Sequence, residues 1–328
     1  MKLLRKILPA FLTFSLALLA SSALAAPPGW ELRNGTWVPL VEPGTGTPEA
    51  QVAKMIRDLR DNGGAASNNV IKDAKAWIKV NPRHPLMPQV LLLQGDAEVL
   101  RGNKYAALYP YEDLLNNYPT SELFLPVLER EFTLSDAFLN GYKRKFLGFR
   151  MLPVTDDALQ LLDRIQDRQR GSAIAEQAGL RVADYYYNDG KFPEALDAYT
   201  DFLKRYPYSQ FVRKAEIRRA EASLGDFRGL LFDFTPLYDA RERLATITNA
   251  FPQTAEELQA RAIDDRIYQL EGQKELEIAR YYFRAGKKYA AAYYYKRVAS
   301  NWPDTAFADT ARKELFARLP SMAGGLSK

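Results

Sequence analysis

One residue pattern recurs along this chain of 328 residues and limits its fold more than any other feature. An alanine is followed by larger apolar residues four and seven positions on, and by a proline at the twelfth. Positions four and seven apart share one face of an α-helix, and a proline ends the helix before it. The pattern therefore predicts stacked helical hairpins, which form surfaces for partners more often than catalytic cavities. Its four clear copies are Ala107, Tyr111, Leu114, Pro119; Ala195, Tyr199, Phe202, Pro207; Ala240, Leu244, Ile247, Pro252; and Ala291, Tyr295, Val298, Pro303.

The best-defined repeat unit covers residues 173–207. Its first helix carries the small residue Ala183, its second carries Tyr199, and residues 189–191 supply the turn between them. Small residues at such positions let two antiparallel helices approach closely, while larger ones fill the gaps between units. This unit resembles a tetratricopeptide repeat, and the last unit of the chain repeats its pattern around Ala279.

The units are unevenly spaced. About six of them fit between residues 48 and 318, including one without the proline that carries Ala158, Leu162 and Ile165. A tetratricopeptide unit has about 34 residues, so the surplus must lie in insertions. The places expected for it are an inserted loop at 141–153, another at 225–236, and one long helix over 254–285 that no proline interrupts.

The first 25 residues are typical of a secretory signal peptide. Three cations within the first six residues precede an apolar stretch at 7–20 and a small-residue cleavage site that ends at Ala25. The alternative is an uncleaved membrane anchor. Cleavage would remove three positive charges and lower the net charge from +5 to +2. Because no run of lysine and arginine stands out, we expect no nucleic-acid partner.

Residues 26–47 are predicted to form a hairpin followed by a linker. Asn34-Gly35 supplies the positive φ angles of a two-residue turn, which sets Leu32 opposite Trp37. The same residues begin an N-glycosylation sequon with Thr36, although the turn explains them without glycosylation. At the other end of the chain, residues 319–328 are expected to be a flexible tail.

The sequence lacks the residues of most catalytic and metal sites. It has no cysteine, and His84 is its one histidine, so neither a His/Cys metal site nor thiol chemistry is expected. Adjacent carboxylates on a helix, such as Asp156-Asp157, point in different directions and suit paired acid–base work poorly. We therefore expect no enzyme, no cofactor and no small-molecule substrate. One alternative stays open, namely a cell-wall enzyme or its regulator with carboxylates that act in a groove of the repeat array.

Two aromatic clusters occupy corresponding places on the first helices of their units, at 185–187 and 281–283. First helices line the concave surface of a tetratricopeptide array, and tyrosine and arginine are enriched among interface anchors. The alternative is that these side chains pack against neighbouring units. The residues predicted to face a partner in the groove are Asp184, Tyr187, Asn188, Arg280, Phe283 and Arg284.

The signal peptide and the uneven, divergent repeats resemble BamD and its relatives, most specifically over residues 183–207 and 228–242. That family comprises outer-membrane lipoproteins that serve β-barrel assembly from the periplasm. The resemblance covers roughly residues 66–316. It implies an all-α, right-handed superhelical solenoid and a non-enzymatic periplasmic scaffold, whose partners are β-barrel assembly subunits or client peptides held in the concave groove.

The sequence departs from that family at the anchor. Members carry a lipidated cysteine directly after the signal peptide, whereas this sequence has Ala26 there and no cysteine among its 328 residues. We therefore expect no lipid anchor, and a periplasmic protein that is at most peripheral to the outer membrane. The alternative function is a periplasmic adaptor of the same fold in envelope maintenance or cell division.

Overall fold

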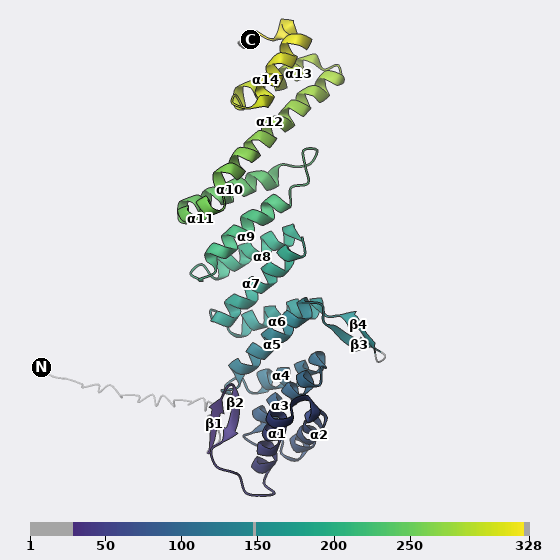
Figure 1. Cartoon of the computed structure of the whole chain (residues 1–328), viewed down its shortest axis with the longest axis vertical. Helices are drawn as coiled ribbons and strands as arrows, with labels where there is room; N and C mark the ends of the chain where they lie inside the picture. Colours follow the sequence, from purple (N-terminus) through teal and green to yellow (C-terminus); the bar gives the residue numbers. More distant parts are fainter. Residues whose placement is uncertain (1–28, 147–148, 325–328) are drawn as a thin grey trace, which may run out of the picture. The chain divides into compact units, whose positions relative to one another are not determined.

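The computed structural model describes residues 29–146 and 149–324, which are helical apart from two short β-hairpins (Figure 1). The predicted signal peptide at 1–25 lies outside the described residues. The chain divides into two compact units, and each is treated by itself below. Unit 1 comprises Met1–Leu134 with Arg144–Leu152, and unit 2 comprises Ser135–Lys143 with Pro153–Lys328. The division of the sequence into signal peptide, hairpin and linker, solenoid and tail stays a prediction.

Unit 1 stacks a β-hairpin and a series of antiparallel helices. α2 packs on α3, and α3 packs on α4 along most of its length. Gly95 allows this close approach, because a Cβ there would lie 2.1 Å from Cε1 of Tyr111. The elements are β1 (Trp30–Arg33), β2 (Thr36–Pro39), α1 (Pro48–Asn62), η1 (Gly63–Ala65), α2 (Ser67–Val80), α3 (Met87–Leu100), α4 (Lys104–Asn117) and α5 (Phe124–Leu139), whose last residues belong to unit 2.

The N-terminal hairpin is confirmed with its expected register. Asn34 and Gly35 adopt φ angles of 50° and 68°, and Leu32 pairs with Trp37 across the antiparallel strands. The Trp37 side chain is fully buried, and its backbone N–H donates to Oε1 of Gln89 on α3 at 2.8 Å. The hairpin is thus fixed to the helices of unit 1 by its buried tryptophan, and one of its edge donors is satisfied.

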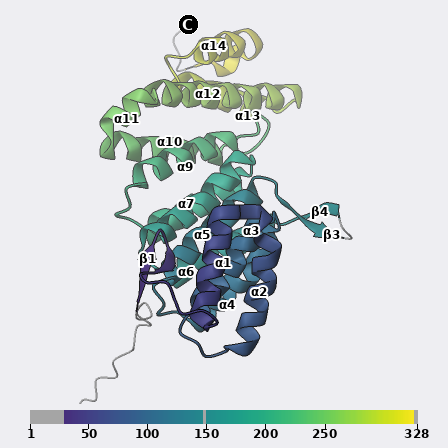
Figure 2. The ribbon, with the colours of Figure 1, turned by 60° about the horizontal axis from the view of Figure 1, so that its bottom comes forward.

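Unit 2 continues the same alternation of first and second helices. α7 packs on α8 and α8 on α9, while α12 packs on α13 and α13 on α14. Its helices are α6 (Thr155–Arg168), α7 (Ala173–Asn188), α8 (Phe192–Arg205), α9 (Val212–Gly225), α10 (Thr235–Ala250), α11 (Pro252–Glu257), α12 (Ala260–Arg284), α13 (Lys288–Asn301), α14 (Ala306–Arg318) and η2 (Pro320–Met322). Two strands, β3 (Lys143–Phe146) and β4 (Phe149–Pro153), precede α6, and all of their residues except the first of β3 and the last of β4 belong to unit 1. Figure 2 shows α12 alongside α13 and α10.

The alanine-to-proline pattern marks the second helices, as the sequence predicts. Its copies fall on α4, α8, α10 and α13, and their alanines and following aromatic or aliphatic residues are buried. In the unit without the proline, the pattern falls on α6, whose Ala158, Leu162 and Ile165 are fully buried. The all-α fold class built from helical hairpins is therefore confirmed.

The prediction of a single long helix over 254–285 is wrong. α11 ends at Glu257, Gln259 turns left-handed with φ 52°, and α12 starts at Ala260. Leu258 and Ala260 on either side of the turn pack in one cluster with Leu244 and Ile247 of α10, and this burial offsets the cost of the left-handed residue. No glycine or proline marks the turn, so the sequence carries no local signal for it.

The two expected insertions have different structures. Residues 226–234 are irregular, as predicted, between α9 and α10. Residues 141–153, expected to be a loop, instead form the β3–β4 hairpin. At the C-terminal end, Leu319 and Ala323 flank the short helix η2 and are buried against the α13–α14 pair.

Candidate functional site

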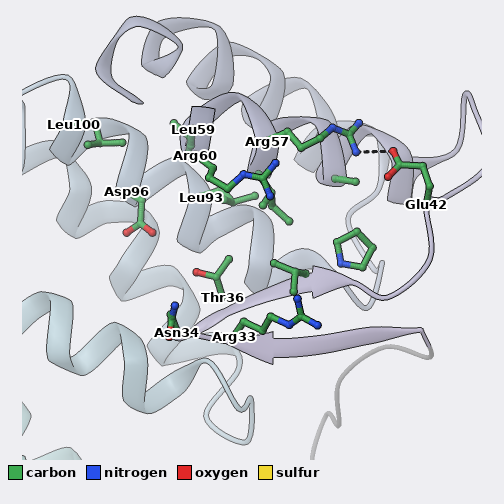
Figure 3. Close-up of a pocket in the computed structure, with 14 residues that line it drawn as sticks. Arg33, Asn34, Thr36, Glu42, Arg57, Leu59, Arg60, Leu93, Asp96 and Leu100 are labelled. Carbon is green, nitrogen blue, oxygen red and sulfur yellow. Dashed lines mark hydrogen bonds and ion pairs between the residues drawn. The ribbon is translucent and has the colours of Figure 1, made fainter. Parts of the chain in front are cut away.

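Unit 1 contains a cavity of about 630 Å³ between the N-terminal hairpin and helices α1 and α3 (Figure 3). This volume lies within the range of natural ligand pockets, about 300–1,000 Å³. Its lining combines buried aliphatic groups, among them Ile56 and Leu93, with the half-exposed Leu100. We call this site, lined by residues of β1, β2, α1 and α3, the hairpin pocket.

Three arginines surround the hairpin pocket: Arg33 at the end of β1, and Arg57 and Arg60 one turn apart on α1. Arg57 pairs with Glu42, as Figure 3 shows, while Arg33 pairs with Glu31 at 2.7 Å. Arg60 pairs with Asp61 at 2.9 Å. Exposed pairs of this kind contribute about 0–1 kcal/mol, so an incoming carboxylate can replace Glu31 or Asp61 at little cost.

The hairpin pocket keeps its shape because the hairpin is fixed to the helices at its turn and at Trp37 of β2. Trp37 is buried beneath it, and a Cβ on Gly35 in the turn would lie 3.0 Å from Cβ of Pro126 on α5. On the helical side, Thr47 caps α1 by accepting the backbone N–H of Ala50 at 3.1 Å. The sequence predicts the turn and the pairing of Trp37 with Leu32. It does not predict which helices the hairpin covers, and therefore it does not indicate that these arginines share one site.

Asp96 on α3 also lines the hairpin pocket, but its charge is already compensated. The Tyr111 hydroxyl donates to Asp96 Oδ1 at 2.6 Å, and Arg130 on α5 binds both carboxylate oxygens at 2.7 and 3.1 Å. Burial first, and then the charge of Asp96, hold the pKa of Tyr111 well above its ordinary value. We call such a set, one charge on a first helix, a second-helix tyrosine and an opposite charge on the following helix, a latch.

Unit 2 contains a second latch with the same residue order. The Tyr199 hydroxyl donates to Asp184 Oδ1 at 2.7 Å, and Lys214 on α9 lies 2.6 Å from Asp184 Oδ2. Burial raises the pKa of Tyr199, and the hydrogen bond to Asp184 raises it further. In both latches the acid precedes the tyrosine by fifteen residues, a spacing that could have revealed them in the sequence.

The third latch, at the C-terminal end of unit 2, reverses the two charges. Arg280 on α12 stands fifteen residues before Tyr295, and Glu314 on α14 supplies the acid. Arg280 binds Glu314 Oε1 at 2.6 Å, and the Tyr295 hydroxyl donates to Glu314 Oε2 at 2.8 Å. Burial raises the pKa of Glu314, but the hydrogen bonds from Arg280 and Tyr295 outweigh it and leave that pKa below its ordinary value.

The six residues predicted to face a groove partner lie in unit 2, three on α7 and three on α12. Asp184 and Arg280 belong to latches. The Tyr187 hydroxyl donates to Glu221 on α9 at 3.1 Å, and Arg318 on α14 lies over the Phe283 ring at 5.0 Å. These four side chains thus link each first helix to the next, and their role in binding a partner stays a prediction.

Asn188 and Arg284, the last residues of α7 and α12, are exposed. α7 packs against α6, α8 and α9, whereas α12 packs against α10, α11, α13 and α14. The structure therefore places the two predicted triplets on separate hairpins of unit 2, each beside its own neighbours.

Two further features bear on the kind of site. Within residues 29–146 and 149–324, no cluster of three or more His, Asp or Glu side chains is arranged to hold a metal ion. His84 lies 3.0 Å from Glu49 and contacts the edge of Trp77, so its surroundings are those of a packed turn. In the same described ranges, no helix has the length and apolar character needed to cross a membrane.

Comparison with known families decides the relationship. The profile of YfiO, described as an outer membrane lipoprotein family, matches residues 154–319, just over half of the chain. The chain belongs to the YfiO family. A tetratricopeptide-repeat profile matches residues 89–121, which are α3, α4 and the turn after them. This YfiO-family protein is therefore a tetratricopeptide-type scaffold for protein interactions, and its family points to the cell envelope.

A solved structure and the curated proteins add little. The C-terminal part of a TPR repeat-containing protein from Cytophaga hutchinsonii aligns over 81% of this chain and 88% of its own, at 12% identity and a TM-score of 0.37. No curated protein matches the sequence significantly. The family is described as a lipoprotein family, but the 328 residues of this member include no cysteine to which a lipid could be attached.

Proposed function

We propose that this YfiO-family protein is a non-enzymatic periplasmic scaffold in outer-membrane protein assembly, and that its hairpin pocket binds an extended segment of a client or partner protein. One observation carries the proposal: the cavity of about 630 Å³ joins an aliphatic floor to three arginines whose partners are largely exposed acids. That combination suits a segment with apolar side chains and a carboxylate.

An extended peptide fits this site better than a rigid globular partner. The pocket is bordered by a two-stranded sheet, and strands present backbone groups on which an extended peptide can align. Leu100 and Leu93 offer apolar contact, while Arg33 and Arg60 offer charge-assisted hydrogen bonds to carboxylates. The family's description as an outer membrane lipoprotein supports a place at the outer membrane, and the role in assembly follows from the resemblance to BamD.

Site-specific photo-crosslinking in intact envelopes tests the proposal. A photoreactive amino acid at Leu100, which is half exposed in the pocket, should capture a β-barrel assembly subunit or an unfolded outer-membrane client. The matched control is Val80 at the end of α2, an exposed aliphatic residue of the same unit outside the pocket. Capture at Leu100 should fall about tenfold when Arg33→Glu and Arg60→Glu remove both rim cations.

Equal capture at Leu100 and Val80, or capture that ignores the two arginine substitutions, would remove the pocket from the proposed function. Specific capture of a cell-division or cell-wall protein would favour an envelope adaptor instead.

A further inference from the structure

The β3–β4 hairpin exposes large apolar side chains that nothing else in the described part of unit 1 covers. Phe149 is 71% and Met151 58% exposed. Successive strand residues alternate between faces, so these two share one face of β4. An exposed face of this kind on an inserted element marks a site of contact with something else.

The same hairpin is strongly basic. Residues 144–152 include Arg144, Lys145 and Arg150 and contain no acidic residue. Lys145 is exposed, whereas the Arg144 guanidinium lies 5.0 Å from the ring centroid of Tyr105 on α4. This cation–π contact fixes the hairpin against the helix.

A tyrosine extends the surface onto α4. The rings of Tyr105 and Tyr109 meet edge to face with centroids 6.3 Å apart, and Tyr109 is 67% exposed. Lys145, Phe149 and Met151 are exposed on the hairpin and Tyr109 is exposed on the helix that it contacts, and we call these four residues the basic hairpin surface. It combines two apolar side chains, an amphipathic tyrosine and one exposed lysine, and residues 144–152 of the hairpin supply no acidic counter-charge.

We propose that the basic hairpin surface docks on an anionic phospholipid membrane. At such an interface, apolar side chains enter the boundary of the acyl chains, tyrosine lies at the headgroups, and lysine reaches the phosphates. An acidic polypeptide would neutralise the cations but leave Phe149 and Met151 in water, so a membrane fits all of these groups better. The inference rests on the envelope location in the proposed function, and it provides attachment for a lipoprotein-family sequence that contains no cysteine.

Vesicle co-sedimentation of the protein without its predicted signal peptide, residues 26–328, tests the docking. The protein should bind phosphatidylcholine vesicles that contain about 30% phosphatidylglycerol, and should bind pure phosphatidylcholine at least about tenfold more weakly. Lys145→Glu should weaken binding to the anionic vesicles about tenfold, and Phe149→Ser with Met151→Ser should do the same. Two matched controls, Lys204→Glu on α8 and Leu231→Ser, which is 94% exposed, should bind as the parent does.

A fluorescent label reports insertion independently of affinity. Because the chain has no cysteine, Met151→Cys provides one unique attachment site for a polarity-sensitive dye. Its emission should shift to the blue on addition of anionic vesicles, whereas the same dye at Leu231→Cys should not respond. Circular dichroism checks that each variant keeps its helical content.

Parent-like vesicle binding by both hairpin variants, or an unshifted dye at Met151→Cys, would overturn the docking proposal. So would capture of poly-glutamate at the hairpin without any binding to anionic vesicles. The crosslinking at Leu100 is a separate readout: if it fails while vesicle binding holds, the proposed function fails and the membrane surface stands. If vesicle binding fails while Leu100 still crosslinks, the membrane-docking proposal fails and the proposed function stands.

Discussion

The hairpin pocket of unit 1 and the first-helix face of unit 2 use their charged residues differently. Around the pocket, Arg33 pairs with the exposed Glu31 and Arg60 with the exposed Asp61, and both arginines remain accessible. On the first-helix face, Asp184 and Arg280 are engaged by residues of the following helices. The difference shows that charge on a first helix can serve the stacking of the repeats, whereas the binding site that we propose lies where an added hairpin leaves a cavity.

A second difference lies within unit 2 itself. The Asp184 latch places its acid on the first helix, and the Arg280 latch places its base there, yet each tyrosine donates to the acid. The chain therefore preserves the hydrogen bond and the ion pair while exchanging their positions. This exchange makes the two latches electrostatically distinct. If α12 took the place of α7, Arg280 would face Lys214, and if α7 took the place of α12, Asp184 would face Glu314.

The largest effect is expected from Trp37→Ala, which removes the anchor of the hairpin. Trp37 is fully buried, so the substitution should lower the free energy of unfolding by about 3–5 kcal/mol and open the pocket. Urea unfolding followed by circular dichroism measures the loss. The exposed Phe149→Ala is the control and should change stability by less than about 0.5 kcal/mol. A Trp37→Ala protein as stable as the parent would show that the hairpin contributes nothing to unit 1.

Gly95→Ala should destabilise unit 1 by about 1–3 kcal/mol, because the added methyl group would overlap the Tyr111 ring. Gly171→Ala is unsuitable as a control, since φ at that position is 75°. Gly324→Ala meets no atom within 4 Å and serves instead. Thermal unfolding should separate the two, and identical melting temperatures would contradict the tight contact between α3 and α4.

Reversal of the third latch is testable by exchange of its charges. Arg280→Glu alone and Glu314→Arg alone each place like charges together and should cost about 1.5–3 kcal/mol. The double variant restores an opposite pair in the order of the Asp184 latch. It should regain about 1 kcal/mol relative to the sum of the single variants. A strictly additive double variant would mean that the two side chains do not interact.

The third latch should also lose stability in acid. The pKa of Glu314 is lowered from its ordinary 4.5 when the protein folds, so its contribution is complete above pH 4.5 and disappears as the pH falls through the folded value. The difference in unfolding free energy between the parent and Glu314→Gln should therefore shrink with acidification below pH 4.5. A difference that stays constant down to the lowest pH at which the protein folds would exclude this linkage.

The smallest effect concerns the tyrosine hydroxyl. Tyr295→Phe should cost about 1 kcal/mol through the lost hydrogen bond to Glu314. Burial, followed by that hydrogen bond, raises the pKa of Tyr295 to about 12. Ultraviolet difference titration of the parent against Tyr295→Phe should thus show the missing tyrosine ionising well above pH 10. Ionisation near pH 10 would contradict its burial beside an acid.

The repeat helices were predictable because their pattern is local. Tyr199 and Tyr295 fall on the buried faces that their offsets indicate, and Asn34-Gly35 specified the turn of the hairpin. The left-handed turn at Gln259 was not predictable, since it follows from packing against α10 and carries no glycine or proline. The hairpin pocket was equally hidden, because Arg33 and Arg57 line one cavity only after the hairpin has packed across the helices.

The central claim is that the hairpin pocket, and not the first-helix face of unit 2, receives the partner. Parallel photo-crosslinking at Leu100 in the pocket and at Asn188, the exposed last residue of α7 that was predicted to face the groove, tests it in the same envelopes. The account predicts a strong adduct with one envelope protein at Leu100 and none with that protein at Asn188. An adduct at Asn188 without one at Leu100 would contradict it.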